Sequence, residues 1–171
     1  MKTRDLTLTL AAVCLLALPA AARGQKAIFV VRHAEKISDA DERLTDAGRA
    51  RAALLAQMLR DSGVTAIYAT DTERARDTVE PLADLLGLKV ATYDTGASMS
   101  GRVDARPFVA ALRKSHGKDV VLIAGHSNTI PDLLRAFGCP DAITLASNEY
   151  DNIFVVLPKA DGRATLVRLR Y

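Results

Sequence analysis

Four side chains suited to phosphate chemistry stand just beyond stretches that predict buried strands. Arg32 and His33 come directly after an apolar, β-branched run, and His126 follows another run of this kind. Arg74 lies in the first turn of a helix predicted after a third apolar run. Because ligands bind beyond the carboxyl ends of parallel strands, we expect these two arginines and two histidines to meet at one edge of one sheet.

These residue types fit a pocket for a phosphoryl group. Arginine presents a planar fork of N–H donors that matches phosphate oxygens. Two arginines and one histidine can surround the three equatorial oxygens and stabilise the charge that spreads over them in the transition state. The other histidine can attack phosphorus in line and carry the group covalently. A nucleophilic histidine must be unprotonated, and flanking arginines should lower its pKa from the ordinary value of about 6.5.

Each of these signals also has a plainer interpretation. A histidine after an apolar strand is more often a packed, hydrogen-bonded residue than a catalyst, and Arg74 could pair with Asp71 or Asp77 on a solvated face. The two histidines together with Glu35 suggest a metal site, but a histidine flanked by arginine is a poor ligand for a cation. The joint placement at successive strand ends favours the phosphoryl pocket, with no metal or cofactor.

The elements that must position these residues alternate along the chain. Apolar runs predict strands at 27–31, 66–69, 89–93, 119–124, 152–157 and 164–170. Helical spacing predicts helices at about 45–62, 72–86 with a kink or break near Pro81, 103–116 and 130–137. Residues 95–101 read as a loop, and 149–151 as packing at the edge of the sheet. This order predicts one α/β domain, a three-layer α/β/α sandwich with a largely parallel central sheet.

Length and composition agree with a single globular domain. The chain has 171 residues, of which 49% are hydrophobic and 25% charged, which excludes disordered and collagen-like chains. A formal net charge of +3 and only 5% aromatic residues argue against a nucleic-acid binder. Two cysteines are too few for a disulfide-rich scaffold or a four-thiolate zinc site. No feature of the sequence specifies an oligomeric state.

Residues 1–22 have the layout of a secretory signal peptide. Basic residues precede an apolar run at 10–18, and small residues follow it. That run is shorter than the roughly 20 residues a membrane-spanning helix needs. We therefore expect a signal peptide that is cleaved after Ala22, or alternatively before Gln25. A buried amino-terminal helix and an uncleaved anchor are the less favoured interpretations. The mature domain, 23–171, would then be exported to the periplasm or secreted, without a stable membrane span.

The motifs around these residues resemble those of the histidine phosphatase superfamily, which has the phosphoglycerate mutase-like fold. Arg32-His33-Ala34-Glu35 is similar to the family's Arg-His-Gly/Ala-Glu motif after the first strand. Three further motifs follow in family order, namely Leu-Thr-x-x-Gly at 44–48, Arg-x-x-x-Thr at 74–78 and the second-histidine motif at 125–129. The resemblance extends over essentially all of residues 26–171.

The resemblance implies a role for each of the four residues. His33 would be the nucleophile that becomes phosphorylated, and Arg32, Arg74 and His126 would form the phosphate pocket. No metal is implied. Glu35 would either orient its neighbours or lie on the surface as a solvated carboxylate.

Three further residues are candidates for binding the phosphorylated substrate. Many members of the family have two serines after the second strand, where this chain has Thr70-Asp71, so one hydroxyl is retained. Ser127 and Asn128 could add hydrogen bonds to the phosphate or could only cap the helix that follows.

The general acid is the main departure from the family pattern. Mutases and many broad phosphatases have a glutamate in a longer segment after the third strand, where this chain has a short loop. Asp94 is the carboxylate nearest to this position, and Asp104 is the next. Asp94 could be the general acid or could only be a turn residue. The short loop argues against a mutase. The sequence thus predicts an exported, metal-independent phosphomonoesterase that uses His33, with a phosphohistidine phosphatase or a non-catalytic phosphate-binding module as alternatives.

Overall fold

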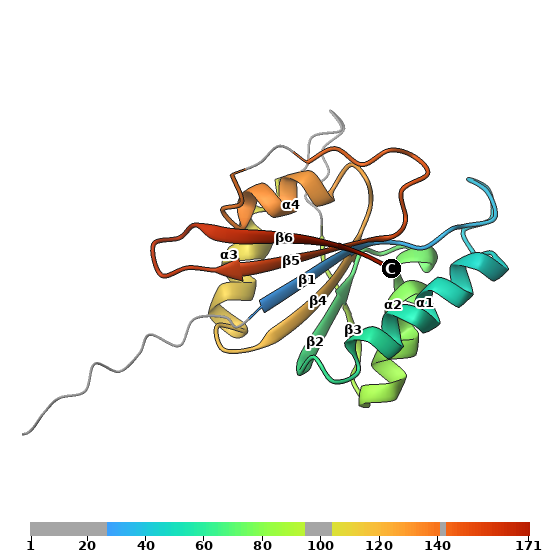
Figure 1. The fold of residues 1–171 in the computed structure, drawn as a ribbon, viewed down its shortest axis with the longest axis horizontal. Helices are drawn as coiled ribbons and strands as arrows, with labels where there is room; N and C mark the ends of the chain where they lie inside the picture. The colour runs from blue at the N-terminus through green and yellow to red at the C-terminus, as the bar shows by residue number, and fades with distance from the viewer. Residues whose placement is uncertain (1–26, 95–103, 141–142) are drawn as a thin grey trace, which may run out of the picture.

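The computed structural model of the chain describes residues 27–94, 104–140 and 143–171 (Figure 1). The signal peptide predicted at 1–22 and the loop predicted at 95–101 lie outside the described residues. Strands and helices alternate in the predicted order. Their bounds are β1 (Ala27–Arg32), α1 (Asp46–Leu59), β2 (Val64–Ala69), α2 (Glu73–Leu86), β3 (Val90–Thr92), α3 (Arg106–Ser115), β4 (Val120–Gly125), α4 (Ile130–Ala136), β5 (Asn152–Pro158) and β6 (Ala164–Arg170).

The six strands form one sheet in the order β3-β2-β4-β1-β5-β6. The pairs β3–β2, β2–β4 and β4–β1 are parallel, whereas β5 is antiparallel to both β1 and β6. The predicted largely parallel sheet is therefore confirmed. Because β1, β2 and β4 run in the same direction side by side, their carboxyl ends meet at one edge of the sheet.

Helices cover both faces of this sheet, which confirms the three-layer sandwich. In Figure 1, α1 and α2 lie on one side of the sheet and α3 and α4 on the other. The side chains of β4 alternate accordingly. Val121 and Ile123 belong to the core beneath α3 and α4, whereas Leu122 and Ala124 belong to the core beneath α1 and α2. Of the helices within the described ranges, none has the length and apolar character needed to cross a membrane.

The second helix was predicted to be kinked or broken near Pro81, and the break is wrong. Helix α2 continues from Glu73 to Leu86 with Pro81 inside it. An internal proline removes one helical hydrogen bond and costs about 3 kcal/mol. Val79 and Leu82 on the same helix are 0% and 1% exposed. Burying each such side chain stabilises the fold by about 1.5–3 kcal/mol, which offsets that loss.

Candidate active site

Strands β1 and β4 carry the two histidines to the same edge of the sheet. Arg32 stands opposite Gly125 in the parallel register, and the backbone N–H of His33 donates to the Gly125 carbonyl at 2.9 Å. The ring centroids of His33 and His126 lie 5.2 Å apart. Arg74, at the start of α2, contacts the His126 ring. The structure thus brings together Arg32, His33, Arg74 and His126, which we call the histidine–arginine cluster.

The imidazole of His33 is held in one tautomer. Its Nδ1 lies 2.8 Å from the Ala34 carbonyl oxygen. Because a carbonyl can only accept, Nδ1 carries the proton and Nε2 presents a lone pair. His33 is buried, and its pKa is lowered from 6.5 to about 4, chiefly by burial and further by the charges of Arg74 and Arg32. The expected lowering of the pKa is therefore present, with burial as its main cause, and the ring is neutral at neutral pH.

The imidazole of His126 is fixed in the opposite tautomer. Nη2 of Arg74 donates to Nδ1 of His126 over 3.4 Å, and a guanidinium cannot accept. The ring proton therefore sits on Nε2, which donates to the Thr70 hydroxyl at 2.8 Å. Burial and the nearby Arg74 lower the pKa of His126 from 6.5 to about 3. Thr70, a predicted binding residue, thus orients this histidine.

Arg74 is shared between His126 and a carboxylate that the sequence did not indicate. Nη1 of Arg74 is ion-paired with Glu42, which comes from the segment between β1 and α1. Neither Asp71 nor Asp77 has this role, and Asp71 pairs with Arg76 instead. Nε of Arg74 is buried and has no hydrogen-bond partner among the described residues. No motif marks Glu42, because its contact with Arg74 depends on how two separate segments fold together.

Arg32 is bound entirely by backbone carbonyls. Its Nη1 donates to the carbonyls of Ala146, Ser147 and Glu149 at 2.9, 3.0 and 3.1 Å. Its guanidinium carbon lies 4.1 Å from the centroid of the Tyr150 ring, a cation–π contact. Nε is buried without a hydrogen-bond partner in the described part of the chain. A guanidinium held on one side in this way can donate to a ligand from Nε.

Two of the motif positions, Thr78 and Gly48, hold the backbone around the cluster. The Thr78 hydroxyl accepts from the Ala34 N–H at 2.8 Å and donates to the Arg74 carbonyl at 2.7 Å, so it ties the two halves of the cluster together. A Cβ at Gly48 would lie 2.3 Å from the Glu35 carbonyl oxygen. That oxygen also accepts the N–H of Thr45. Helix α1 can therefore approach the backbone of Glu35, just after β1, only because residue 48 is glycine.

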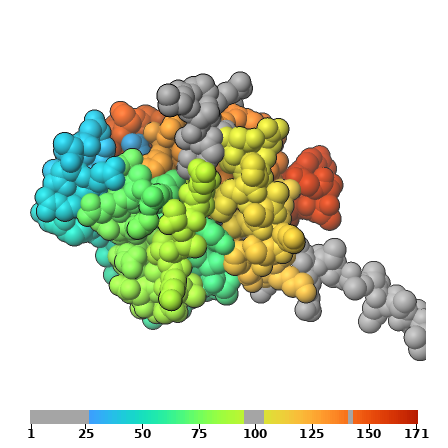
Figure 2. Space-filling view, turned by 180° about the vertical axis from the view of Figure 1, so that it is seen from behind, coloured from blue at the N-terminus to red at the C-terminus, as the bar shows by residue number. Residues whose placement is uncertain are grey.

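A cavity of about 490 Å³ opens beside His126, and Thr70, Asn128 and Asp94 are among the residues that line it. A second cavity of about 380 Å³ lies between β3 and α3 and shares Asp94 with the first. Figure 2 shows this side of the molecule, on which the segment from α2 to β3 (green) lies beside α3 (yellow). Asp94 therefore lies where the two cavities meet, in the lining of the one beside His126.

The remaining candidates take other positions. Ser127 is half-buried in the turn before α4, and the N-cap of α4 is Thr129, without a side-chain cap hydrogen bond. Neither Ser127 nor Asn128 is therefore the residue that caps α4. Glu35 accepts two hydrogen bonds from Nε of Arg51, so it is a structural ion pair and not a free surface carboxylate. Within the described ranges, no group of three or more metal-ligating side chains occurs.

Known proteins with related sequences match part of the chain. The family model described as "Histidine phosphatase superfamily (branch 1)" matches residues 28–95, which contain three of the four motifs. A protein of Yersinia enterocolitica named "Probable phosphoglycerate mutase GpmB" is 38% identical over 73 residues, which cover 38% of this chain. The namesake in Yersinia pestis is 34% identical over 73 residues. The matched segment spans about a third, 34%, of the length of these curated relatives.

Solved structures share the fold over most of the chain. The protein histidine phosphatase SixA complexed with tungstate superposes with a TM-score of 0.66 at 22% identity and covers 84% of this chain and 96% of that one. A mycobacterial glucosyl-3-phosphoglycerate phosphatase complexed with VO3 superposes with a TM-score of 0.64 at 19% identity. The match covers 85% of this chain and 98% of that one. The family model matches the segment that carries Arg32, His33 and Arg74, and the fold agrees beyond it, so the two comparisons together support the histidine phosphatase superfamily for this chain.

Proposed function

We propose that this protein is a metal-independent phosphatase that hydrolyses phosphomonoesters through a phosphohistidine intermediate on His33. The observation that carries the proposal is the tautomer of His33. Its proton is on Nδ1, so Nε2 offers a lone pair beside two arginines, each with a buried Nε–H that has no partner among the described residues. A neutral nucleophile next to anion-binding donors is what in-line attack on a phosphoryl group requires.

The reaction proceeds in two displacements at phosphorus. In the first, Nε2 of His33 forms a bond to phosphorus while the bond from phosphorus to the ester oxygen breaks, and the departing oxygen takes up a proton. In the second, water attacks phosphorus and the N–P bond breaks, which releases orthophosphate and regenerates the histidine. The N–H groups of Arg32 and Arg74 stabilise the equatorial oxygens in both steps, and Nε2–H of His126 joins them when a phosphate oxygen replaces the Thr70 hydroxyl as its acceptor. Removing one such donor typically lowers kcat by about 10²–10³-fold.

Asp94 is the proposed source of the leaving-group proton. It lines the cavity beside His126. Nitrophenolate leaves without help from an acid, whereas an alkoxide does not. Asp94→Asn should therefore slow the hydrolysis of alkyl phosphates much more than that of p-nitrophenyl phosphate. An equal loss on both substrates would argue against this role.

A phosphohistidine phosphatase is the second candidate, and one observation favours it. The protein histidine phosphatase SixA is covered over 96% of its length, so this chain has the size and fold of an enzyme with that name. A phosphohistidine substrate has an imidazole as leaving group, which needs little help from an acid. Hydrolysis of a phosphohistidine-bearing protein together with failure on all phosphomonoesters would favour this candidate over the first.

Export to the periplasm or secretion forms part of the proposal. It is supported by the sequence of residues 1–22, with basic residues, an apolar run and small residues in the order of a signal peptide. Intact-mass measurement of the protein purified from its native cell fraction would show loss of the residues up to Ala22 or Gly24. A full-length mass in the cytosolic fraction would contradict export.

The proposed activity is tested with p-nitrophenyl phosphate in excess EDTA between about pH 5 and about pH 8, with His33→Ala alongside. We expect turnover by the wild-type protein that survives the chelator and disappears in the variant, while circular dichroism remains unchanged. Activity that EDTA abolishes, or that a folded His33→Ala protein retains, would overturn the mechanism.

A further inference from the structure

The orientation of Arg32 depends on one short segment, the 146–149 loop. All three hydrogen bonds of the guanidinium leave from Nη1, and all three end on carbonyls of this loop. The segment lies 114 or more positions away from Arg32 in the sequence. Residues 146–148 are exposed, so the loop is not fixed by burial of its own side chains. Something else must hold these carbonyls in place.

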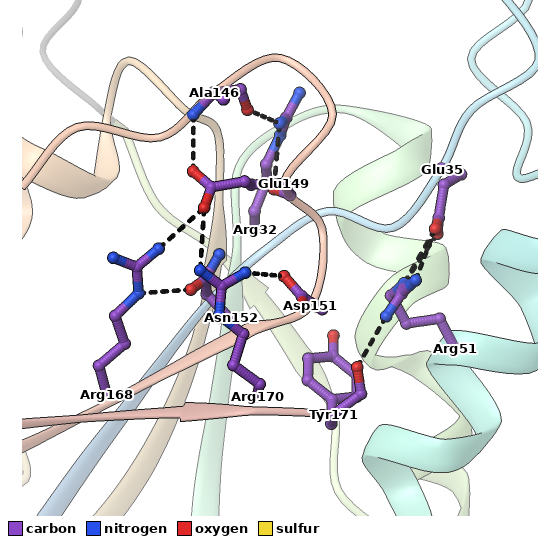
Figure 3. Close-up of polar contacts among 10 residues, drawn as sticks. All are labelled: Arg32, Glu35, Arg51, Ala146, Glu149, Asp151, Asn152, Arg168, Arg170 and Tyr171. Atoms are coloured by element: carbon purple, nitrogen blue, oxygen red, sulfur yellow. Dashed lines mark hydrogen bonds and ion pairs between the residues drawn. The ribbon is translucent and has the colours of Figure 1, made fainter.

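Glu149 closes the 146–149 loop on itself and fastens it to the sheet (Figure 3). Its Oε2 accepts the backbone N–H of Ala146 at 2.8 Å. Its Oε1 accepts from Nη2 of Arg168 at 3.1 Å and from Nη2 of Arg170 at 3.0 Å. Both arginines belong to β6, so one carboxylate connects the two ends of the loop to a strand of the sheet.

Neighbouring contacts fix the two arginines of β6 in turn. Nε of Arg168 donates to the side-chain oxygen of Asn152, a residue that is 0% exposed, at 2.6 Å. Nη1 of Arg170 pairs with Asp151 at 2.7 Å. Figure 3 shows Glu149 between the two guanidinium groups and the 146–149 loop. The loop is thus anchored through Glu149, whereas the side chain of Asp151 pairs with Arg170 and, among the described residues, has no hydrogen bond to the loop.

We infer that Glu149 is a positioning residue that sets the phosphate-binding geometry of Arg32 by holding the 146–149 loop against β6. The inference rests on the proposed function, because it concerns the same phosphate pocket. Without the carboxylate, the Ala146 N–H loses its acceptor and the loop loses its two arginine contacts. The three carbonyls then no longer restrain Nη1, and Nε of Arg32 is no longer preset for a phosphate oxygen. Misplacing a binding group by a small distance is enough to lower activity strongly.

The experiment compares Glu149→Ala with Asp151→Asn, which removes an ion pair of the same Arg170 and leaves the loop contacts in place. For each purified protein we measure KM and kcat with p-nitrophenyl phosphate and the dissociation constant of orthophosphate by calorimetry. Glu149→Ala should raise KM and the orthophosphate dissociation constant by about tenfold. Asp151→Asn should change both by less than about twofold. Equal effects of the two substitutions would overturn the inference.

A double-mutant cycle separates positioning from a general loss of stability. If Glu149 acts through Arg32, Glu149→Ala should have almost no further effect on orthophosphate binding in an Arg32→Ala background. An effect that adds in full to that of Arg32→Ala would overturn the inference. Glu149→Gln keeps an acceptor for the Ala146 N–H, so it should rescue part of the loss and replaces the alanine variant if that protein does not fold.

The outcomes for the wild-type protein distinguish the two claims. Orthophosphate binding without turnover would remove the proposed function, and the binding constants of the variants would still decide the role of Glu149. A wild-type protein that neither binds orthophosphate nor hydrolyses the ester would overturn both.

Discussion

The two arginines of the histidine–arginine cluster are held in opposite ways. Arg32 donates from one nitrogen to three backbone carbonyls and stacks on the Tyr150 ring, and no carboxylate of the described residues is bonded to it. Arg74 donates to the carboxylate of Glu42, an ion pair that offsets much of its charge. Neutral partners orient Arg32 and leave its charge available, whereas Glu42 occupies Arg74 until a stronger ligand replaces it.

In the proposed mechanism, this difference would divide the work of binding a phosphoryl group. An arriving phosphate would find Arg32 already oriented, but it would have to compete with Glu42 for Nη1 of Arg74. The side chain of Glu42 is 37% exposed, so it can move into solvent at little cost. Arg32 should therefore contribute more to binding than Arg74, and substitutions around the two residues should act in opposite directions.

Removing the guanidinium of Arg32 should have the largest effect. Arg32→Ala should lower kcat/KM for p-nitrophenyl phosphate by about 10²–10³-fold, because it removes a donor that is preset for the transition state. Arg74→Ala should cost less, since it removes a charge that Glu42 already offsets. Arg76→Ala, on the same helix and exposed, serves as the control and should leave kcat/KM unchanged. A larger loss for Arg74→Ala than for Arg32→Ala would reverse the comparison.

A side chain at residue 48 should disturb the segment that carries Glu42 and not the loop that holds Arg32. A Cβ there would lie 2.3 Å from the backbone oxygen of Glu35, which cannot move aside cheaply. Gly48→Ala should therefore lower the free energy of unfolding by about 1–3 kcal/mol, measured by urea denaturation. Ala47→Ser, at the exposed neighbouring position, should change it by less than about 0.5 kcal/mol. Equal stability of the two variants would contradict the close approach.

Freeing Arg74 from its carboxylate should strengthen phosphate binding. Glu42→Gln removes the competing charge, so the inhibition constant of orthophosphate should fall, by about threefold for a pair that is partly exposed. Asp39→Asn, in the same segment but paired with Lys36, is the matched control and should have no effect. Weaker orthophosphate binding in Glu42→Gln would mean that Glu42 orients Arg74 and does not compete for it.

The two histidines should make the fold less stable in mild acid. Their pKa values are about 4 and about 3 in the folded protein, below the 6.5 expected in the unfolded chain. Between these values the unfolded chain takes up protons that the folded protein excludes, so stability falls as the pH decreases from about 6.5 to about 4. Thermal denaturation across this range should show the loss, and His126→Asn should reduce it. An unchanged pH dependence in that variant would contradict the lowered pKa.

The smallest effect concerns how the arginines act on the pKa of His126. After burial, the charge of Arg74 is the largest cause of the lowered pKa, and the charge of Arg32 is the smallest. Arg74→Ala should therefore raise the pKa of His126 more than Arg32→Ala does, as measured by an NMR titration of the ring. The opposite order would show that Arg74 is not the arginine nearer to His126.

The sequence predicted the parts of the site that depend on strand ends. Continuous apolar runs placed β1 and β4 correctly, and their parallel pairing brings His33 and His126 to one edge, as the strand-end argument expected. The same argument placed Arg74 and Thr70, because both follow β2 directly. Local patterns suffice here, since each residue is positioned by the strand or helix next to it.

The partners of the arginines were not predictable from local patterns. Glu42 comes from an irregular segment, and Glu149 was expected only to pack at the edge of the sheet. Each contacts a residue that is distant in sequence, and no periodicity reports such a contact. Helix α2 continues through Pro81 for a similar reason, because tertiary burial outweighs a local penalty. The assignment of Asp94 as general acid remains a prediction, supported by its place in the cavity beside His126.

The central claim is that His33 carries the phosphoryl group, and direct detection of that intermediate is its most decisive test. The protein is mixed with a phosphomonoester, quenched in base because phosphohistidine is labile in acid, and analysed by peptide mass spectrometry. We expect one added phosphoryl group on the peptide that contains His33, and its loss in His33→Ala. Full turnover with no phosphorylated His33, or with the phosphoryl group on another residue, would contradict the mechanism.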